Sequence, residues 1–180
     1  MRRLYRIVML VALGLGGLLA VASPPQGEYQ IKAAYLLNFA RYMEWPAMRL
    51  PGGAPLRLCV LGRDPFGGAL AGLEGRQVNG HEVRVRSADS VDVATECHIV
   101  FVSDSEERRM GLILRGLAMR GVLTVSDIEG FAEAGGSIGL VTEDDRVRFD
   151  INQASLQRDS LRASSQLLRL GRNVIGTKGP

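Results

Sequence analysis

The stretch that decides the fold is residues 97–102, which read Cys-His-Ile-Val-Phe-Val. Four consecutive β-branched or aromatic residues are typical of a central strand that is covered on both faces, as in a parallel sheet. The runs LRLCVL at 56–61 and VLTV at 122–125 have the same character and flank it in the sequence. The segments between these runs are long enough for helical crossovers, so the three strands are predicted to be parallel.

Helical and hairpin patterns surround this core. Residues 28–45 carry apolar side chains at spacings of three and four and end at Pro46, which predicts an amphipathic helix. Further elements are predicted as helices over 65–73, 105–120 and 153–170 and as a strand over 81–86. Residues 137–142 and 147–151 are predicted to form a hairpin. We therefore expect an α/β fold, a three-layer sandwich whose mainly parallel sheet carries an antiparallel hairpin at one edge.

The N-terminus has the pattern of a secretory signal peptide. Arg2, Arg3 and Arg6 precede a nearly unbroken apolar run, and Ala20-Val21-Ala22 supplies the small-x-small site that a signal peptidase needs. The run is shorter than the roughly 20 residues that span a bilayer, which disfavours an uncleaved anchor helix. We therefore expect residues 1–22 to be a cleaved signal peptide and residues 23–180 to form a single α/β domain.

Export changes the charge balance of the working protein. The full chain has 22 basic and 19 acidic residues, and its net charge of +3 alone would suggest a nucleic-acid or membrane-surface protein. The predicted signal holds three arginines and no acidic residue, so removing 22 of the 180 residues leaves 158 with 19 charges of each sign. The composition therefore argues against a nucleic-acid partner.

No group of polar residues in the sequence has all the features of a catalytic or cofactor-binding site. Residues 135–139 match the hydrolase pattern G-x-S-x-G, but Ser137 precedes a strand rather than a helix, and both histidines come before it. The loop 62–68 lacks the signatures of a dinucleotide-binding or P-loop site. His81 and His98 stand alone, without the spacing of metal ligands. We therefore predict a non-enzymatic protein with no catalytic residues, metal or cofactor.

Cys59 and Cys97 are the only two cysteines of the chain. An even number of cysteines in an exported protein favours a disulfide, because the compartment is oxidising. Cys59 lies in one predicted strand and Cys97 at the entrance to another, and neighbouring strands could bring the two together. Two free, buried thiols are the alternative that the sequence leaves open.

Four stretches in order make the sequence resemble the YfiR family of periplasmic regulators. The first two are IKAAYLLNF at 31–39 with EWP at 44–46, and LCVLGRDPFG at 58–67 with VNG at 78–80. The other two are CHIVFV at 97–102, and VLTVSD at 122–127 followed by GF at 130–131, GG at 135–136, FDIN at 149–152, Leu161 and SSQLL at 164–168. The resemblance runs from about Tyr29 to Val174, nearly the whole predicted mature chain.

The resemblance implies regulation in the periplasm rather than catalysis. The family's best-known function is to bind the periplasmic sensor domain of the inner-membrane diguanylate cyclase YfiN and to repress it, which lowers cyclic-di-GMP and biofilm formation. An outer-membrane lipoprotein, YfiB, sequesters such a repressor, and a homodimer is a further expectation by analogy. Two alternatives stay open: an accessory module for a sensor histidine kinase, and a small-ligand-binding module on the same sheet.

The resemblance also bears on the cysteines. Cys59 and Cys97 match the family's disulfide positions. Some relatives carry a second cysteine pair near the Gly-Gly segment, where this chain has Ala132 and Gly139. Any redox response that depends on a second bridge is therefore not expected here.

The resemblance finally suggests which residues contact a partner. The hairpin and the start of the last predicted helix are similar to the surface that the family uses for this purpose. The candidate partner-binding residues are therefore Phe131, Ile138, Asp150 and Leu156. Ordinary core packing is the alternative for the three apolar side chains among them.

Overall fold

The structure is a computed structural model and describes residues 26–176. The predicted signal peptide at 1–22 lies outside the described residues. The helices are α1 (Gln26–Tyr42), η1 (Ala69–Leu73), α2 (Val91–Thr95), η2 (Asp104–Arg109), α3 (Met110–Leu117), α4 (Gln153–Arg158) and α5 (Ser165–Leu170), where η marks a 3₁₀-helix. The strands are β1 (Met43–Glu44), β2 (Leu56–Leu61), β3 (Gln77–Val78), β4 (His81–Ala88), β5 (Ile99–Val102), β6 (Leu123–Ser126), β7 (Ile138–Glu143), β8 (Arg146–Asn152), β9 (Arg162–Ala163) and β10 (Asn173–Ile175).

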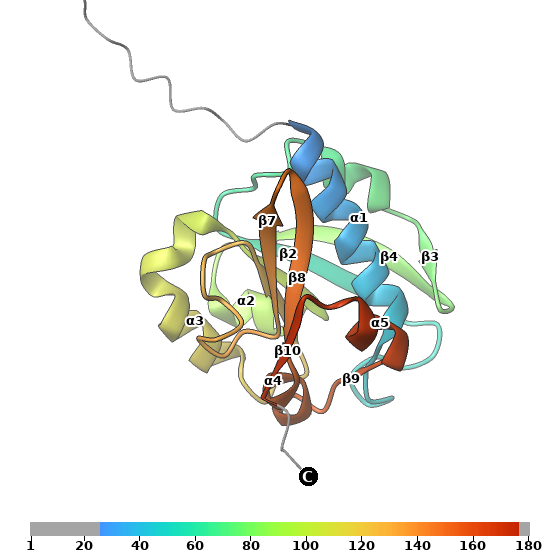
Figure 1. The fold of residues 1–180 in the computed structure, drawn as a ribbon. Helices are drawn as coiled ribbons and strands as arrows, with labels where there is room; N and C mark the ends of the chain where they lie inside the picture. The colour runs from blue at the N-terminus through green and yellow to red at the C-terminus, as the bar shows by residue number, and fades with distance from the viewer. Residues whose placement is uncertain (1–25, 177–180) are drawn as a thin grey trace, which may run out of the picture.

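Eight strands form one sheet in the order β10-β8-β7-β6-β5-β2-β4-β3. The run from β4 to β7 is parallel, whereas β3 is antiparallel to β4 and β8 is antiparallel to β7. This arrangement confirms the predicted α/β fold with a mainly parallel sheet. The β7–β8 hairpin stands next to the end of the sheet, because β10 pairs with β8 from outside. In Figure 1, β7 and β8 run steeply across β2 and β4, so the sheet is strongly curled.

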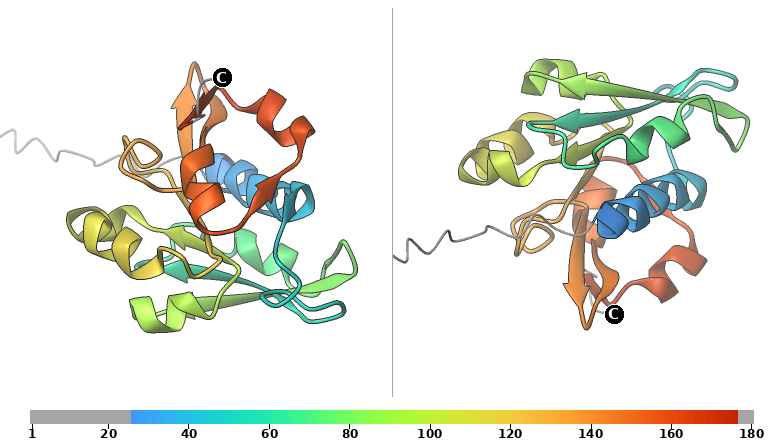
Figure 2. Two further views of the ribbon diagram at one scale, coloured as in Figure 1. Left: turned by 90° about the horizontal axis from the view of Figure 1, so that it is seen from below. Right: turned by 90° about the horizontal axis from the view of Figure 1, so that it is seen from above.

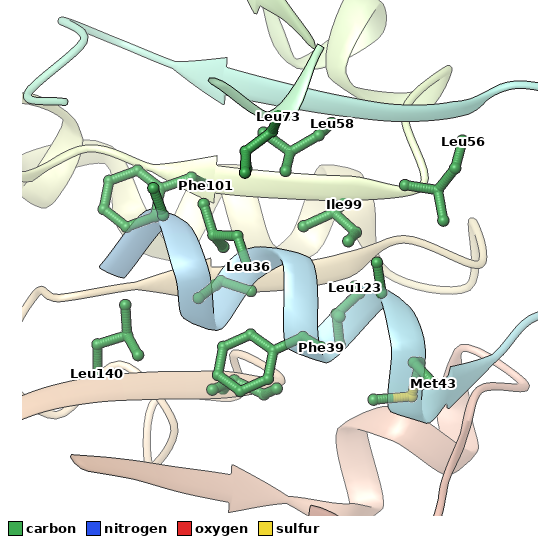
Figure 3. Close-up of a cluster of buried hydrophobic side chains, with 14 of the residues drawn as sticks. Leu36, Phe39, Met43, Leu56, Leu58, Leu73, Ile99, Phe101, Leu123 and Leu140 are labelled. Atoms are coloured by element: carbon green, nitrogen blue, oxygen red, sulfur yellow. The ribbon is translucent and has the colours of Figure 1, made fainter. Parts of the chain in front are cut away.

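Helix α1 fills the hollow of the curled sheet. Its buried stripe includes Leu36 and Phe39 and lies against Leu58 of β2 and Leu140 of β7 in one apolar cluster (Figure 3). Figure 2 shows α1 between the hairpin and the β2–β4 end of the sheet. Burying one face of α1 against both ends of the sheet joins these two ends into one core.

The opposite face of the sheet is covered by α2 and α3. Ile113, Leu114 and Leu117 of α3 are buried in a second cluster that also contains both cysteines. A disulfide joins Cys59 in β2 to Cys97, which follows α2. Helices on the two faces with the sheet between them give the three layers of the predicted sandwich. Within residues 26–176, no helix combines the length and the apolar character needed to cross a bilayer.

The prediction of one continuous helix over 153–170 is wrong. The structure has the two short helices α4 and α5, separated by β9, which pairs with β1. Ser160 adopts a left-handed conformation with φ of 57°, and the hydroxyl of Ser164 accepts a hydrogen bond from the Leu167 N–H to cap α5. Serine side chains that bond to the backbone favour caps and turns over helix interiors. Leu170, at the end of α5, is 62% exposed.

Two other predicted helices also differ from the structure. The region 105–120 contains η2 and α3, and Ser103 caps the first of these. The region 65–73 contains only the short η1. In α1, Ile31 is 48% exposed, because the buried stripe of the helix passes through Lys32 instead.

The disulfide generates a stability prediction. It closes a loop with a sequence separation of 38 residues, and the loss of chain entropy in the unfolded state corresponds to about 4 kcal/mol. Reduction should lower the free energy of unfolding by about this amount, measured by urea unfolding with and without reductant. The Cys59→Ala/Cys97→Ala double variant is the matched control, because reductant should not change its stability. Alkylation of both cysteines in the unreduced, folded chain would contradict the bridge.

Candidate functional site

A groove of about 520 Å³ lies where α1, β7 and the loop after β6 meet. Its lining comes from Glu28 and Lys32 at the start of α1, from the loop 127–133, from residues 139–142 of β7, and from Asp150 and Arg172. Both Asp127 and the overhanging part of β7 lie beyond the carboxyl end of β6. Ligand sites of open α/β sheets commonly lie at this end of the parallel strands. This groove is therefore the candidate functional site.

Lys32 is the centre of the polar side chains in the groove. It is only 4% exposed, and its Nζ lies 2.6 Å from Asp127 Oδ2 and 2.6 Å from Glu28 Oε1. The same ammonium group lies over the ring of Tyr29, 4.5 Å from the ring centroid. The Thr142 hydroxyl donates to Glu28 Oε1 at 2.9 Å. These contacts connect the start of α1 to the end of β6 and to the far half of β7.

The environment of this cluster holds its groups in defined protonation states. Burial and the charge of Asp127 raise the pKa of Tyr29, so its hydroxyl remains protonated and donates to Asp127 Oδ2 at 2.9 Å. Burial alone would raise the pKa of Glu28, but hydrogen bonds from Lys32 and Thr142 outweigh it and lower that pKa. At neutral pH the Tyr29 phenol is therefore neutral and the Glu28 carboxyl group is charged. The contacts of the cluster join the start of α1 to the end of β6 and to β7.

Arg172 forms a second polar clamp at the other side of the groove. Its Nε donates to Asp150 Oδ1 at 2.9 Å and its Nη2 to Asp150 Oδ2 at 2.5 Å, and it also binds Glu143. The Asn173 side chain adds a bond to Asp150 Oδ1 at 3.0 Å. The hydrogen bonds from Arg172 lower the pKa of Asp150, so this buried carboxylate stays charged. The clamp holds the entrance to β10 against the β7–β8 hairpin.

The four candidate partner-binding residues are all buried in the chain. Phe131 and Asp150 line the groove and are 1% and 2% exposed. Ile138 begins β7 and is fully buried, while Leu156 of α4 is 2% exposed beside a smaller cavity of about 320 Å³. None of the four offers a free surface as the chain stands, so their role in partner contact stays a prediction.

The glycines near Ser137 serve packing against Phe131. A Cβ atom on Gly136 would lie 2.1 Å from the Phe131 ring, so only glycine fits at this position. Ser137 itself is completely buried, and its Oγ lies 3.1 Å from the hydroxyl of Thr124. A nucleophilic serine has to reach a substrate and a base. The G-x-S-x-G pattern therefore marks a tight turn before β7.

The two histidines are structural groups in separate places. The Arg57 N–H donates to His98 Nδ1 at 2.9 Å, so His98 Nε2 carries the proton and donates to the Arg49 carbonyl oxygen at 3.1 Å. Burial lowers the pKa of His98 to about 4. His81 is half-buried, with Nδ1 2.8 Å from the Ala54 carbonyl oxygen. Among the described residues, no group of three or more His, Cys, Asp or Glu side chains could hold a metal ion.

Neither polar clamp is predicted from the sequence. Lys32 occurs within the buried stripe of α1 between Tyr29 and Leu36, and a lysine at such a position is the one signal that a partner carboxylate must exist. The partner, Asp127, is 95 residues away in the sequence. Arg172 belongs to the connection between α5 and β10, which has no recognisable pattern.

Comparisons with known proteins give one family and a shared fold. The model of the DUF4154 family, described as YfiR/HmsC-like, matches residues 29–172. The crystal structure of the ABC domain in complex with L-Trp from Streptococcus pneumonia has 9% identity and a TM-score of 0.55, covering 79% of this chain and 60% of that chain. A conserved domain protein from Vibrio cholerae has 7% identity and a TM-score of 0.54, covering 79% and 59%. These two structures share the fold alone, and the chain spans about three fifths of their length.

The Lys32 cluster generates the second prediction. Lys32→Met keeps the aliphatic length and removes the charge, which leaves two carboxylates facing each other in a mostly buried site. We expect the free energy of unfolding at pH 7 to fall by about 3 kcal/mol, as for other broken buried ion pairs. Arg109→Met is the matched control, because it breaks the exposed Arg109–Glu106 pair and should cost less than about 1 kcal/mol. Equal, small losses for both variants in urea unfolding would refute a central role for Lys32.

The buried His98 generates the third prediction, a loss of stability in acid. Its pKa of about 4 in the folded chain lies below the ordinary value of 6.5, so the unfolded chain binds the proton more tightly. The resulting stability is complete above pH 6.5 and is lost as the pH falls towards 4, by about 3 kcal/mol. His98→Asn has no titrating ring, so its unfolding free energy should fall less steeply over this pH range. Parallel pH profiles for the two chains would show that His98 contributes nothing.

Proposed function

A family model that matches most of the chain places it in the YfiR/HmsC-like family, and from this membership we propose that the protein represses an inner-membrane diguanylate cyclase. The family is one of periplasmic, non-enzymatic regulators of cyclic-di-GMP signalling. The proposed target is the periplasmic sensor domain of a YfiN-like cyclase. Repression lowers cyclic-di-GMP and biofilm formation.

The observation that carries the proposal is the family match over residues 29–172. Three features support it. The disulfide suits an oxidising compartment such as the periplasm. The predicted signal peptide at 1–22 provides the route there, and the mature chain from 23 to 180 is the single regulatory domain. The two cations of the groove, Lys32 and Arg172, are held by carboxylates, which keeps its walls in place and suits a surface used for recognition.

The proposed mechanism is stoichiometric binding. A sensor domain that exchanges between an active and an inactive conformation is shifted towards the inactive one when the repressor binds that form more tightly. A complete switch from one form to the other needs a preference of about 10⁴-fold. Release requires a competitor for the repressor, and a YfiB-like outer-membrane lipoprotein is the proposed one. The free repressor is proposed to be a homodimer.

We assign Phe131, Ile138, Asp150 and Leu156 an indirect part in partner binding. Their side chains are buried, so substitutions act through the position of the groove walls. Asp150, for example, holds Arg172 and thereby the connection to β10. Loss of such a support moves the surface that a partner contacts without removing a contact atom.

Deletion of the gene tests the proposal. Cellular cyclic-di-GMP, measured by mass spectrometry, should rise several-fold because the cyclase loses its repressor, and surface-attached growth should increase with it. A plasmid copy of the full chain should restore the low level. A copy that lacks residues 2–22 is the matched control and should not restore it, because the protein cannot reach the periplasm.

The identity of the partner is tested by crosslinking in the periplasm. Recovery of a diguanylate cyclase supports the proposal. An unchanged cyclic-di-GMP level together with crosslinking that recovers no cyclase would rule the proposal out. Recovery of a sensor histidine kinase instead would assign the protein to kinase signalling.

A further inference from the structure

We propose that the open edge of β7 binds an extended, positively charged segment of the partner as an added β-strand. The inference rests on the proposed function, since it specifies where and how the regulated sensor domain is held. Four features of the groove lead to it: the length of β7, the direction of its backbone groups, the position of the groove and its charge.

Strand β7 extends well past its neighbour β6. The two strands pair only at Val125 with Ile138 and at Ser126 with Gly139. Strand β7 continues to Glu143 and keeps its pairing with β8 over this whole length. Residues 140–143 therefore have β8 on one side and, within the described part of the chain, no strand on the other.

The alternation of the ladder shows which backbone groups face the open side. The Asn152 N–H donates to the Ser137 carbonyl oxygen at 2.9 Å, and every second residue of an antiparallel strand bonds to the same neighbour. The turn at Asp144 and Asp145, both with positive φ, agrees with this register, because its flanking residues form a bonded pair. Leu140 and Thr142 therefore turn their N–H and C=O groups away from β8. Leu140 follows the last β6 pair, Ser126 with Gly139, and still faces the end of β6, whereas Thr142 faces the open side.

The groove runs along this open edge. Gly139, Leu140, Val141 and Thr142 all line it, although they are consecutive residues. Successive side chains of a strand point to opposite faces of the sheet. A groove that touches both faces of one strand must pass along its edge. The backbone groups of Thr142, which is exposed, are therefore accessible from it, whereas Leu140 is only 3% exposed.

The charge of the groove indicates which kind of peptide segment would bind there. Its lining contains five carboxylates, from Glu28, Asp127, Glu129, Glu133 and Asp150, against two cations. Both cations are engaged, since Lys32 binds two of these carboxylates and Arg172 binds Asp150 and Glu143. Glu129 and Glu133 are exposed at the rim, and neither has an ion pair among residues 26–176. A segment with lysine or arginine side chains complements this rim, whereas an acidic peptide is repelled.

Strand addition suits these features better than side-chain docking. An uncovered strand edge is a ready template for another chain, and proteins usually protect it. Main-chain bonds to the edge provide affinity, while alternate side chains and charges provide specificity. Here the edge offers the outward backbone groups of Thr142 beside an acidic rim.

The test titrates the full mature chain with the purified periplasmic sensor domain of a YfiN-like cyclase by calorimetry. Thr142→Pro removes the outward N–H of residue 142 and blocks the edge, so we expect the affinity to fall about tenfold or more. Thr142→Val is the matched control: it also loses the hydroxyl bond to Glu28 but keeps the backbone N–H, so its affinity should stay close to that of the unchanged chain.

Charge and hydrogen exchange provide readouts that do not depend on proline. Glu129→Lys/Glu133→Lys should weaken binding about tenfold, and Glu107→Lys, an exposed site outside the groove, should not. Binding should also slow amide exchange at Thr142. Binding that Thr142→Pro and the Glu129/Glu133 variant leave unchanged, with no slowing at this amide, would overturn strand addition and leave the proposed function intact. Failure of the unchanged chain to bind the sensor domain would overturn the proposed function and this inference with it.

Discussion

The rest of the structure depends on covering both faces of β5. Its four residues from Ile99 to Val102 are completely buried, and a strand without polar positions can only be stable between two apolar layers. Helices α1 and η1 cover one face, and α2 and α3 cover the other. The disulfide reinforces the second face, where the helices are short, by joining the α2–β5 connection to β2.

The β7–β8 hairpin pairs less extensively with the parallel strands than these strands pair with one another, and a polar contact helps to hold it in place. Only two residues of β6 pair with β7, so most of the hairpin lacks the support that the parallel strands give one another. Lys32 supplies part of that support, because it binds both Asp127 after β6 and Glu28, which in turn accepts a bond from Thr142. A buried ion pair costs desolvation, but it specifies geometry that apolar packing alone would leave adjustable.

The sequence predicts the elements that carry strong periodicity and fails where structure depends on distant contacts. Strand β2 has the predicted bounds 56–61, because a continuous apolar run in a parallel sheet admits few alternatives. Strands β1, β9 and β10 contain two or three residues each and form only because other segments lie beside them. The pairing of Lys32 with Asp127 spans 95 residues. No local pattern encodes such a contact, although a lysine in a buried stripe shows that one is needed.

The open edge of β7 gives a physical explanation for the candidate partner-binding positions that the family resemblance suggests. Ile138 is the first residue of β7, and Asp150 pairs with Gly139 beside it. Phe131 packs so closely that a Cβ on Gly136 would meet its ring, and its own Cβ is 3.9 Å from where a Cβ on Gly139 would be. Three of the four buried candidates therefore determine where β7 begins and how it leaves β6. A partner that pairs with the backbone of this strand would respond to them without touching their side chains, since strand pairing depends on the position of the backbone to within a fraction of the hydrogen-bond length.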